Sequence, residues 1–435
     1  MISAVTKSGS EAKTGGPFRV MVVDDSAIIR GFLCRYLTED PDIEVVTTAN
    51  NGEVALRQLT MHDIEVVVLD IEMPVMDGMT ALPRMIDLVP DLRVVMASTL
   101  TRKNAEVSLR ALQMGAVDYV PKPETARSVN ANIDFRRELV DKVKVWASRG
   151  RKKRGEEMPQ SLRGGAIVGS TLATTARARL TTPGFTRPAR PAAPGFAAPA
   201  GRAAVKPVAV VPKGRAEVGD DDSIPTGVPR QENIKLRTGS FRKPKILVIG
   251  SSTGGPQALM KFFEGFPSKP SMPILITQHM PATFTAILAD HLGQKTGWVS
   301  QEGRDGMAVE AGQIYVAPGG KHMEVVEESG EIRLKLTDDP PENFCKPSVD
   351  PMFRSVTKIY GENVLAVILT GMGHDGLKGS RVLTRAGGTV FAQDEASSVV
   401  WGMPGAVSEA GLCTEILPIE KLGAATAKRM QGGVG

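Results

Sequence analysis

The sequence has few of the residues that stabilise secreted or metal-stapled domains. Only three cysteines occur in 435 residues, and Cys34, Cys345 and Cys413 are widely spaced and odd in number. This pattern excludes a disulfide scaffold and favours a reducing compartment. No CxxC pair is present, so we expect no structural zinc site.

Long apolar segments are also missing. The first 17 residues contain no apolar stretch of the kind found in a signal peptide. The other apolar runs have the length of β-strands, and none approaches the roughly 20 residues of a membrane span. We therefore expect a cytoplasmic protein without membrane insertion.

The length of 435 residues predicts about two or three domains. Residues 158–216 contain no Asp or Glu but nine Lys or Arg among many Ala, Pro and Gly. Few of these residues could pack into a core, so we expect a flexible linker over 151–240 that carries much of the net charge of +5. The basic run at 149–155 lacks interleaved aromatics and a helix-turn-helix pattern, so we expect no nucleic-acid binding.

Two α/β blocks flank the linker, over 18–150 and 241–430. In each block, short β-branched runs alternate with helical stretches, which predicts parallel sheets covered by helices. A β-hairpin is expected at 324–336 in the second block. The expected strands lie at 18–25, 64–71, 92–98 and 118–122 and then at 245–250, 273–279, 313–318, 364–371 and 388–394. The expected helices include Ala27–Leu37, Asn104–Met114 and a closing helix through Leu139, Val143 and Trp146.

Acidic residues follow two strands of the first block. Asp24 and Asp25 end one strand and Asp70 ends another, at the edge where open parallel sheets bind ligands. Such a carboxylate cluster suits Mg²⁺, and Asp70 could then attack a phosphoryl donor. Lys122 could stabilise the phosphoryl oxygens, and Ser98 could hydrogen-bond the group. The alternative is a set of solvated acids at the ends of strands.

The combination of DD at 24–25, Asp70 followed by MPVMDG, Ser98 and KP at 122–123 resembles the receiver domain of two-component response regulators. The resemblance covers the whole block. It implies a doubly wound five-stranded fold with Asp70 as the phosphoacceptor. It also implies that Asp24, Asp25 and the backbone carbonyl of Glu72 bind Mg²⁺ with Asp70.

The second block opens with a strand, the small-residue turn GSSTGG and a helix. This turn would aim a serine at a helix N-terminus, where N–H groups favour developing negative charge. A helix N-cap role for Ser252 and a phosphate-binding turn are the alternatives. GxGxxG and GK[ST] are both missing, which disfavours nucleotide binding.

A serine nucleophile needs a base and a group that orients the base. His279 follows the strand at 273–279, and Asp375 follows the strand at 364–371. Together with the serine, they would lie at the ends of three strands on one edge of the sheet. The other histidines are His62, His291, His322 and His374.

The motifs ITQHMPATFT, YVAPGGKHM, KPSVDPMFRSV, LTGMGHDGLKG and AQDEASSVVWGMP, together with GSSTGG, resemble the catalytic domain of chemotaxis-specific protein-glutamate methylesterases (CheB). The resemblance implies that Ser252, rather than Ser251, is the nucleophile, with His279 as base and Asp375 as orienter. Thr253 and Met372 would supply oxyanion-hole N–H groups. No cofactor is expected for the esterase step.

The same resemblance implies a reaction and its partners. The substrates would be glutamate methyl esters on the cytoplasmic helices of chemoreceptors, with methanol as product, and receptor glutamines would be deamidated. The phosphodonor would be the chemotaxis histidine kinase.

Several residues keep open roles. His322 could line the substrate site or be structural, and His374 places a second imidazole near Asp375. Trp401 and Met403 could form an apolar wall or pack in the core. His62, His291 and the three cysteines are expected to be ordinary structural residues.

Two other classes of protein compete with an esterase. The second block could bind a partner or nucleotide without catalysis, and labelling of a serine by a fluorophosphonate would separate that class from an esterase. A DNA-binding regulator is the other rival, but no helix-turn-helix pattern occurs.

Overall fold

The computed structural model describes residues 15–99, 101–122, 133–162, 234–240 and 242–432. Residues 163–233 of the linker expected over 151–240 lie outside these residues, as does Pro123. The two α/β domains are described separately below.

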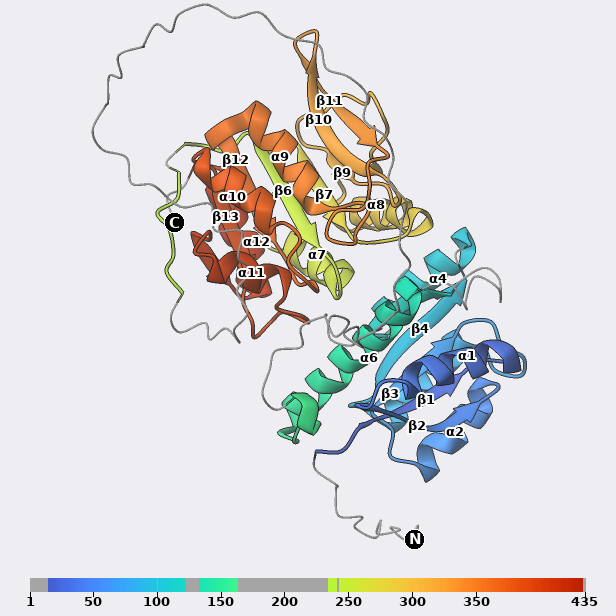
Figure 1. The fold of residues 1–435 in the computed structure, drawn as a ribbon. Helices are drawn as coiled ribbons and strands as arrows, with labels where there is room; N and C mark the ends of the chain where they lie inside the picture. The colour runs from blue at the N-terminus through green and yellow to red at the C-terminus, as the bar shows by residue number, and fades with distance from the viewer. Residues whose placement is uncertain (1–14, 100, 123–132, 163–233, 241, 433–435) are drawn as a thin grey trace, which may run out of the picture. The chain divides into compact units, whose positions relative to one another are not determined.

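The N-terminal domain contains one five-stranded parallel sheet with the order β2-β1-β3-β4-β5 (Figure 1). The strands are β1 (Phe18–Val23), β2 (Ile43–Ala49), β3 (Val66–Asp70), β4 (Arg93–Thr99) and β5 (Asp118–Lys122). The helices are α1 (Ala27–Thr38), α2 (Gly52–Met61), α3 (Gly78–Leu88), α4 (Arg102–Gln113) and α6 (Ile133–Arg154). This is the predicted doubly wound fold, and β2 is the strand that the apolar runs did not indicate.

Local sequence explains where the first four of these helices begin. Ser26, Asn51, Asp77 and Thr101 each accept a hydrogen bond from a backbone N–H of the first helical turn. Such caps satisfy N–H groups that have no partner within the helix. The central strand β3 is buried at every position, as expected for a strand covered on both faces.

The C-terminal domain contains a seven-stranded parallel sheet with the order β14-β13-β12-β6-β7-β9-β8. Its strands are β6 (Ile246–Ser251), β7 (Ile274–Gln278), β8 (Ser300–Glu302), β9 (Ile314–Val316), β12 (Val364–Ile368), β13 (Thr389–Gln393) and β14 (Glu415–Leu417). Its helices are α7 (Gly255–Glu264), α8 (Ala282–Thr296), α9 (Val349–Tyr360), α10 (Leu377–Arg385), α11 (Met403–Glu409) and α12 (Ile419–Met430). The five predicted strands are confirmed, whereas the edge strands β8 and β14, which have three half-buried residues each, were not predicted.

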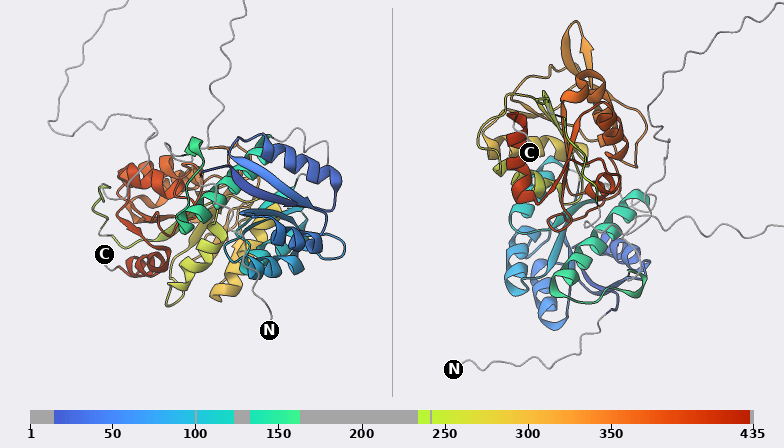
Figure 2. Two further views of the ribbon diagram at one scale, coloured as in Figure 1. Left: turned by 90° about the horizontal axis from the view of Figure 1, so that it is seen from below. Right: turned by 90° about the vertical axis from the view of Figure 1, so that its left-hand side faces the viewer.

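The predicted hairpin is also confirmed. Strands β10 (His322–Glu328) and β11 (Glu331–Thr337) pair antiparallel and project from the C-terminal domain (Figures 1 and 2). Val325 and Leu334 face each other across the hairpin and are buried with Phe353 of α9 in one apolar cluster. The hairpin is therefore anchored to the helix layer on one side of the sheet.

Helix α6 continues to Arg154, past the expected domain boundary at 150. Arg151 is only 3% exposed and pairs with Glu65 through Nε at 2.7 Å and Nη2 at 2.7 Å. Arg154 contacts Glu65 and Glu156. Part of the basic run at 149–155 is therefore neutralised inside the N-terminal domain rather than presented to a partner.

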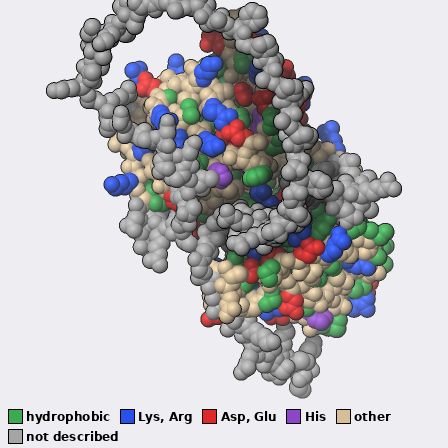
Figure 3. Space-filling model, in the orientation of Figure 1, with side chains coloured by type: hydrophobic (Ala, Val, Ile, Leu, Met, Phe, Trp, Pro, Cys, Tyr) green, Lys and Arg blue, Asp and Glu red, His purple; other side chains and the backbone are tan. Residues whose placement is uncertain are grey.

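Charges of both signs are interspersed on the described part of the face that Figure 3 shows. None of the described helices has the length and apolar character needed to cross a membrane.

Candidate active site and phosphorylation site

The acidic residues of the N-terminal domain converge as predicted. Because β2 and β3 lie on opposite sides of β1, the carboxyl ends of β1 and β3 meet where the strand order reverses. Asp24 and Asp25 follow β1 and Asp70 ends β3, and a carboxylate oxygen from each lies within 4.8 Å of the others. Oxygen ligands at this spacing fit a divalent cation such as Mg²⁺.

Lys122 binds two of these three acids. Its Nζ lies 2.9 Å from Oδ2 of Asp24 and 2.6 Å from Oδ1 of Asp70. Burial raises the pKa of Asp70 to about 6, with a further contribution from the Asp24 charge, although Lys122 opposes both. Asp25, by contrast, is exposed and open to a ligand.

The other predicted receiver residues lie around this cluster. Glu72 and Asp25 line a hollow of about 620 Å³ beside the acids. Ser98 at the end of β4 is fully buried, and its Oγ lies 2.8 Å from Oγ of Ser108 on α4. Ser98, the predicted contact of the phosphoryl group, is therefore linked to α4 through Ser108. No sequence motif indicated Ser108.

Ser252 lies in the turn between β6 and α7. The turn closes through a 2.7 Å hydrogen bond from the N–H of Gly255 to the carbonyl of Ser252, and Gly254 has a φ of 74°. A Cβ at Gly371 would lie 2.8 Å from Cβ of Ser252, so only glycine allows the loop after β12 to approach this closely. Ser252 is half-buried, so solvent can reach part of the residue.

The neighbouring Ser251 has a different environment. Its side chain is fully buried, and its Oγ donates a 2.7 Å hydrogen bond to Oε1 of Gln278. Gln278 in turn donates from Nε2 to the carbonyl of Ser252 at 2.9 Å. Ser251 therefore supports the turn from the buried side, whereas Ser252 remains partly exposed to solvent.

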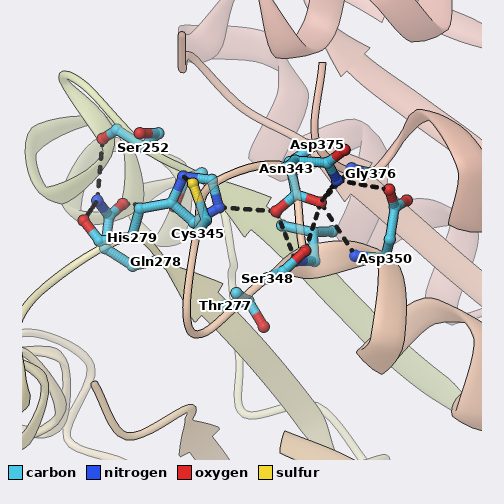
Figure 4. A network of polar contacts seen from close by, with 12 residues as sticks. Ser252, Thr277, Gln278, His279, Asn343, Cys345, Ser348, Asp350, Asp375 and Gly376 are labelled. Carbon is cyan, nitrogen blue, oxygen red and sulfur yellow. Dashed lines mark hydrogen bonds and ion pairs between the residues drawn. The ribbon is translucent and has the colours of Figure 1, made fainter. Parts of the chain in front are cut away.

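His279, which is half-buried, and the buried Asp375 form a hydrogen-bonded pair (Figure 4). His279 directly follows β7, Asp375 lies in the loop after β12, and Nε2 of the imidazole lies 2.7 Å from Oδ2 of the carboxylate. Strand β6 lies between β7 and β12, so the three predicted residues occupy adjacent strand ends. The order of strands also reverses at this edge, where open α/β sheets bind ligands.

The Asp375 carboxylate is surrounded by donors. Oδ1 accepts from Oγ of Ser348 at 2.7 Å and from Nδ2 of Asn343 at 2.8 Å, while Oδ2 accepts from the N–H of Val349 at 2.6 Å. Burial opposes ionisation of Asp375, but the hydrogen bond and charge of His279, together with these donors, lower its pKa to about 2. The carboxylate is therefore charged, and the N-terminus of α9 stabilises that charge.

A second buried carboxylate lies beside Asp375. Nδ2 of Asn343 donates to Oδ2 of Asp350 at 2.9 Å as well as to Asp375, and the N–H of Gly379 donates to Oδ1 of Asp350 at 2.6 Å. Burial and the charge of Asp375 raise the pKa of Asp350 to about 7. Two adjacent carboxyl groups thus have pKa values pushed in opposite directions.

The second nitrogen of His279 contacts a cysteine. Nδ1 lies 3.2 Å from Sγ of Cys345. Burial lowers the pKa of His279, but its interactions with Cys345 and Asp375 outweigh burial and raise the pKa. Cys345 was expected to be an ordinary packing residue, and that expectation is wrong, because its turn carries it to the imidazole.

The two residues predicted to supply oxyanion-hole N–H groups are near Ser252 in the chain or in a neighbouring loop. Thr253 is the next residue in the turn, and Met372 follows Gly371, whose backbone packs against Ser252. Among the hydrogen bonds of the described residues, none uses the N–H of Thr253 or of Met372. Both groups are therefore available to an oxyanion.

The open roles of other residues are resolved by their contacts. His322 is 1% exposed, donates from Nε2 to the carbonyl of Pro340 at 3.0 Å and accepts at Nδ1 from the N–H of Ser348 at 3.1 Å, so it is structural. Met403 is fully buried in the core, and the indole N–H of Trp401 donates to the carbonyl of Gln393. The ring of His374 makes no hydrogen bond with another described residue.

Sequence reasoning missed the residues that hold Asp375. Ser348 and Asp350 belong to the KPSVDP motif, and a serine directly before a helix is a recognisable capping signal. Asn343 and Cys345 carried no such signal, because their contacts depend on a turn between distant elements.

With this geometry in hand, comparison with known proteins gives a consistent result. Residues 247–426 match the CheB methylesterase family, and residues 20–134 match the response regulator receiver domain. A protein-glutamate methylesterase/protein-glutamine glutaminase of Rhodospirillum rubrum is 45% identical over 97% of this chain and 98% of its own length. The chain belongs to the CheB methylesterase family.

Further members and a solved structure are also similar to this CheB chain. A protein-glutamate methylesterase/protein-glutamine glutaminase of Azospirillum brasilense is 44% identical over 95% of this chain and 92% of its own length. The crystal structure of the Thermotoga maritima CheB methylesterase catalytic domain is 38% identical with a TM-score of 0.42, covering 43% of this chain and 99% of its own.

Proposed function

We propose that this CheB protein is a phosphorylation-activated serine esterase that hydrolyses glutamate methyl esters on chemoreceptors and deamidates receptor glutamines. The observation that carries the proposal is the His279–Asp375 pair, whose Nε2 and Oδ2 atoms lie 2.7 Å apart at strand ends next to the Ser252 turn. A binding module or a DNA-binding regulator would not need a histidine–aspartate pair beside a turn that contains a partly exposed serine.

The chemistry follows from the contacts. Ser252 Oγ attacks the ester carbonyl while His279 accepts its proton, and the oxyanion is stabilised by the N–H groups of Thr253 and Met372. His279 returns the proton to the leaving methoxide, so methanol departs and an acyl-serine remains. Asp375 stays ionised throughout and stabilises the imidazolium.

Deacylation reverses the roles. Water attacks the acyl-serine, His279 accepts one of its protons, and Ser252 is regenerated when that proton returns to its oxygen. The product is a glutamate carboxylate. A glutamine side chain can follow the same route, with ammonia leaving in place of methanol.

The receiver supplies the regulatory step. The Asp70 carboxylate attacks the phosphoryl group of the chemotaxis histidine kinase, and Lys122 neutralises charge on the transferred group. Asp24, Asp25, Asp70 and the Glu72 carbonyl would hold Mg²⁺, which when bound would offset charge on the phosphoryl oxygens. Ser98 would then hydrogen-bond the phosphoryl group and pass its presence to α4 through Ser108.

Methanol release tests the substrate assignment directly. Membranes that carry radiomethylated receptors are incubated with the wild-type protein, and volatile methanol is measured against time. We expect release that matches the loss of methyl label from the receptors. If Ser252 is labelled by a fluorophosphonate but no methanol appears, the protein is an esterase for another substrate.

A further inference from the structure

The loop between β11 and α9 contains a tight turn at residues 342–345. The N–H of Cys345 donates to the carbonyl of Glu342 at 2.9 Å, and the N–H of Glu342 donates back to the carbonyl of Cys345 at 3.1 Å. The two central residues, Asn343 and Phe344, have φ values of 53° and 63°. Asparagine adopts this left-handed conformation more readily than other non-glycine residues, whereas phenylalanine avoids it, so the surrounding structure must hold the turn at Phe344.

This turn delivers side chains to both members of the His279–Asp375 pair. Asn343 donates to Asp375 at 2.8 Å, and Cys345 lies 3.2 Å from Nδ1 of His279 (Figure 4). The loop is clamped by His322, whose two ring nitrogens bind the backbone of Pro340 and Ser348 on either side of the turn. The left-handed turn and the two hydrogen bonds of His322 on either side of it therefore fix the positions of the Asn343 and Cys345 side chains.

Hydrogen-bond chemistry fixes which atom donates at Cys345. Asp375 is ionised and cannot donate, so Nε2 of His279 carries the proton in their shared bond. In a neutral imidazole Nδ1 is then the acceptor, and the Cys345 S–H must be the donor. In the alternative ionic state, Nδ1 is protonated and faces a thiolate.

In both states Cys345 occupies the nitrogen that Ser252 needs. Nε2 is engaged with Asp375, so Nδ1 is the remaining site that can accept the Ser252 proton. A ring nitrogen has one in-plane lone pair, and among the described residues no hydrogen bond joins Ser252 Oγ to His279. The thiol and the hydroxyl therefore compete for one acceptor.

We propose that Cys345 is a positioning residue that caps His279 in the resting enzyme and must yield this nitrogen to Ser252 before acylation. The proposal rests on the assignment of Ser252 and His279 in the proposed function. It predicts that the capping contact restrains catalysis rather than supporting it.

Two substitutions at Cys345 should act in opposite directions. Cys345→Ala removes the donor, so the rate at which a fluorophosphonate labels Ser252 should rise about fivefold, the size expected for one neutral hydrogen bond. Cys345→Ser keeps a donor of stronger type, so labelling should be no faster than in the wild type. Methanol release should show the same order in kcat, with KM little changed.

The outcomes separate this proposal from simpler roles. A purely structural cysteine predicts the reverse order, with Cys345→Ala slower and Cys345→Ser restoring the rate, and that result would overturn the proposal. Equal rates in all three proteins would overturn it too. Cys34→Ala, on the receiver helix α1, controls for loss of a thiol elsewhere and should leave labelling unchanged.

A second measurement leaves Cys345 unchanged and compares its rate of alkylation in the wild type and in His279→Gln. Iodoacetamide should alkylate Cys345 more slowly in His279→Gln than in the wild type, because the imidazole no longer accepts the thiol proton. An unchanged alkylation rate would contradict the proposed contact. If His279→Gln also labels at Ser252 as fast as wild type, the base assignment of the proposed function fails instead.

Discussion

At the scale of single residues, the two histidines near Asp375 differ in what they can do. His279 shares a 2.7 Å hydrogen bond with the carboxylate, whereas the His374 ring is half-buried beside it and makes no hydrogen bond with another described residue. We expect His279→Ala to lower kcat by several orders of magnitude, because members of a triad act as a unit. His374→Ala is the matched control, and methanol release measures both. An inactive His374→Ala beside an active His279→Ala would reverse the assignment.

The environment of His279 also sets a pH dependence. The raised pKa of His279 means that the base is protonated over more of the neutral range than an ordinary histidine. Only the neutral form accepts a proton, so kcat/KM should still be rising with pH at and above 7.

Asp70 should give the receiver a pH dependence of its own. Its carboxylate must be ionised to attack a phosphoryl group, and burial has raised its pKa to about 6. With no divalent cation bound, protonation should therefore increase as pH falls through 6, and phosphorylation by a small-molecule donor should be lost there. Bound Mg²⁺ favours the ionised form, so raising its concentration should restore labelling at low pH.

Phosphate-release or radiolabel assays from pH 5 to 8, at low and high Mg²⁺, measure this dependence. Asp70→Asn provides the control, because it keeps the size but removes the nucleophile. Undiminished labelling of Asp70→Asn would move the phosphorylation site elsewhere.

The residues that sequence predicted at each site share one feature. Ser252, His279 and Asp375 all follow apolar strands, so parallel topology alone brings them to one edge. Asn343 and Cys345 could not be found this way. Their contacts depend on left-handed backbone at Asn343 and Phe344, which residue type indicates only weakly for asparagine and not at all for phenylalanine.

At the scale of structural elements, the loop between β11 and α9 holds the site together. His322 clamps this loop at Pro340 and Ser348, and Ser348 donates to Asp375. His322→Ala should leave buried polar groups without partners, which costs about 1–3 kcal/mol for each group. We therefore expect a lower melting temperature and a lower kcat, with KM affected less.

Thermal unfolding and methanol release test this role. His291→Ala on α8 is a suitable control, because His291 lies on a different element from the loop. An unchanged melting temperature and kcat in His322→Ala would show that the clamp is not needed.

Strands with a continuous apolar sequence could be predicted, whereas half-buried edge strands could not. Buried strands such as β6 and β12 are continuous apolar runs and were identified, as was the β10–β11 hairpin. The edge strands β8 and β14 have three half-buried residues each, which leaves no recognisable pattern. Helix α6 continues to Arg154 because Arg151 is buried against Glu65, a long-range contact that composition does not reveal.

At the scale of the whole molecule, the receiver and the esterase should be coupled. We expect a fragment that begins near Asn233 to hydrolyse receptor esters faster than the unphosphorylated full chain. A phosphodonor with Mg²⁺ should raise the full chain toward the fragment and leave the fragment unchanged. If activation is about 100-fold, the inhibited state needs a bias of only about 2.7 kcal/mol.

Initial rates of methanol release from the two proteins, with and without donor, measure the coupling. Equal rates in all four conditions would mean that the receiver does not inhibit the esterase. A fragment slower than the phosphorylated full chain would mean that the receiver also activates it.

Ser252 is the residue on which the proposed methylesterase chemistry depends most directly, as its nucleophile. The most direct test is methanol release from methylated receptor membranes by the wild type, Ser252→Ala and Ser251→Ala, with folding checked by circular dichroism. We predict that Ser252→Ala is folded and inactive, because a half-buried hydroxyl in a turn adds little to the core. Ser251→Ala should retain activity, because the hydroxyl of Ser251 is buried and donates its hydrogen bond to Gln278. An active Ser252→Ala beside a folded but inactive Ser251→Ala would contradict the account.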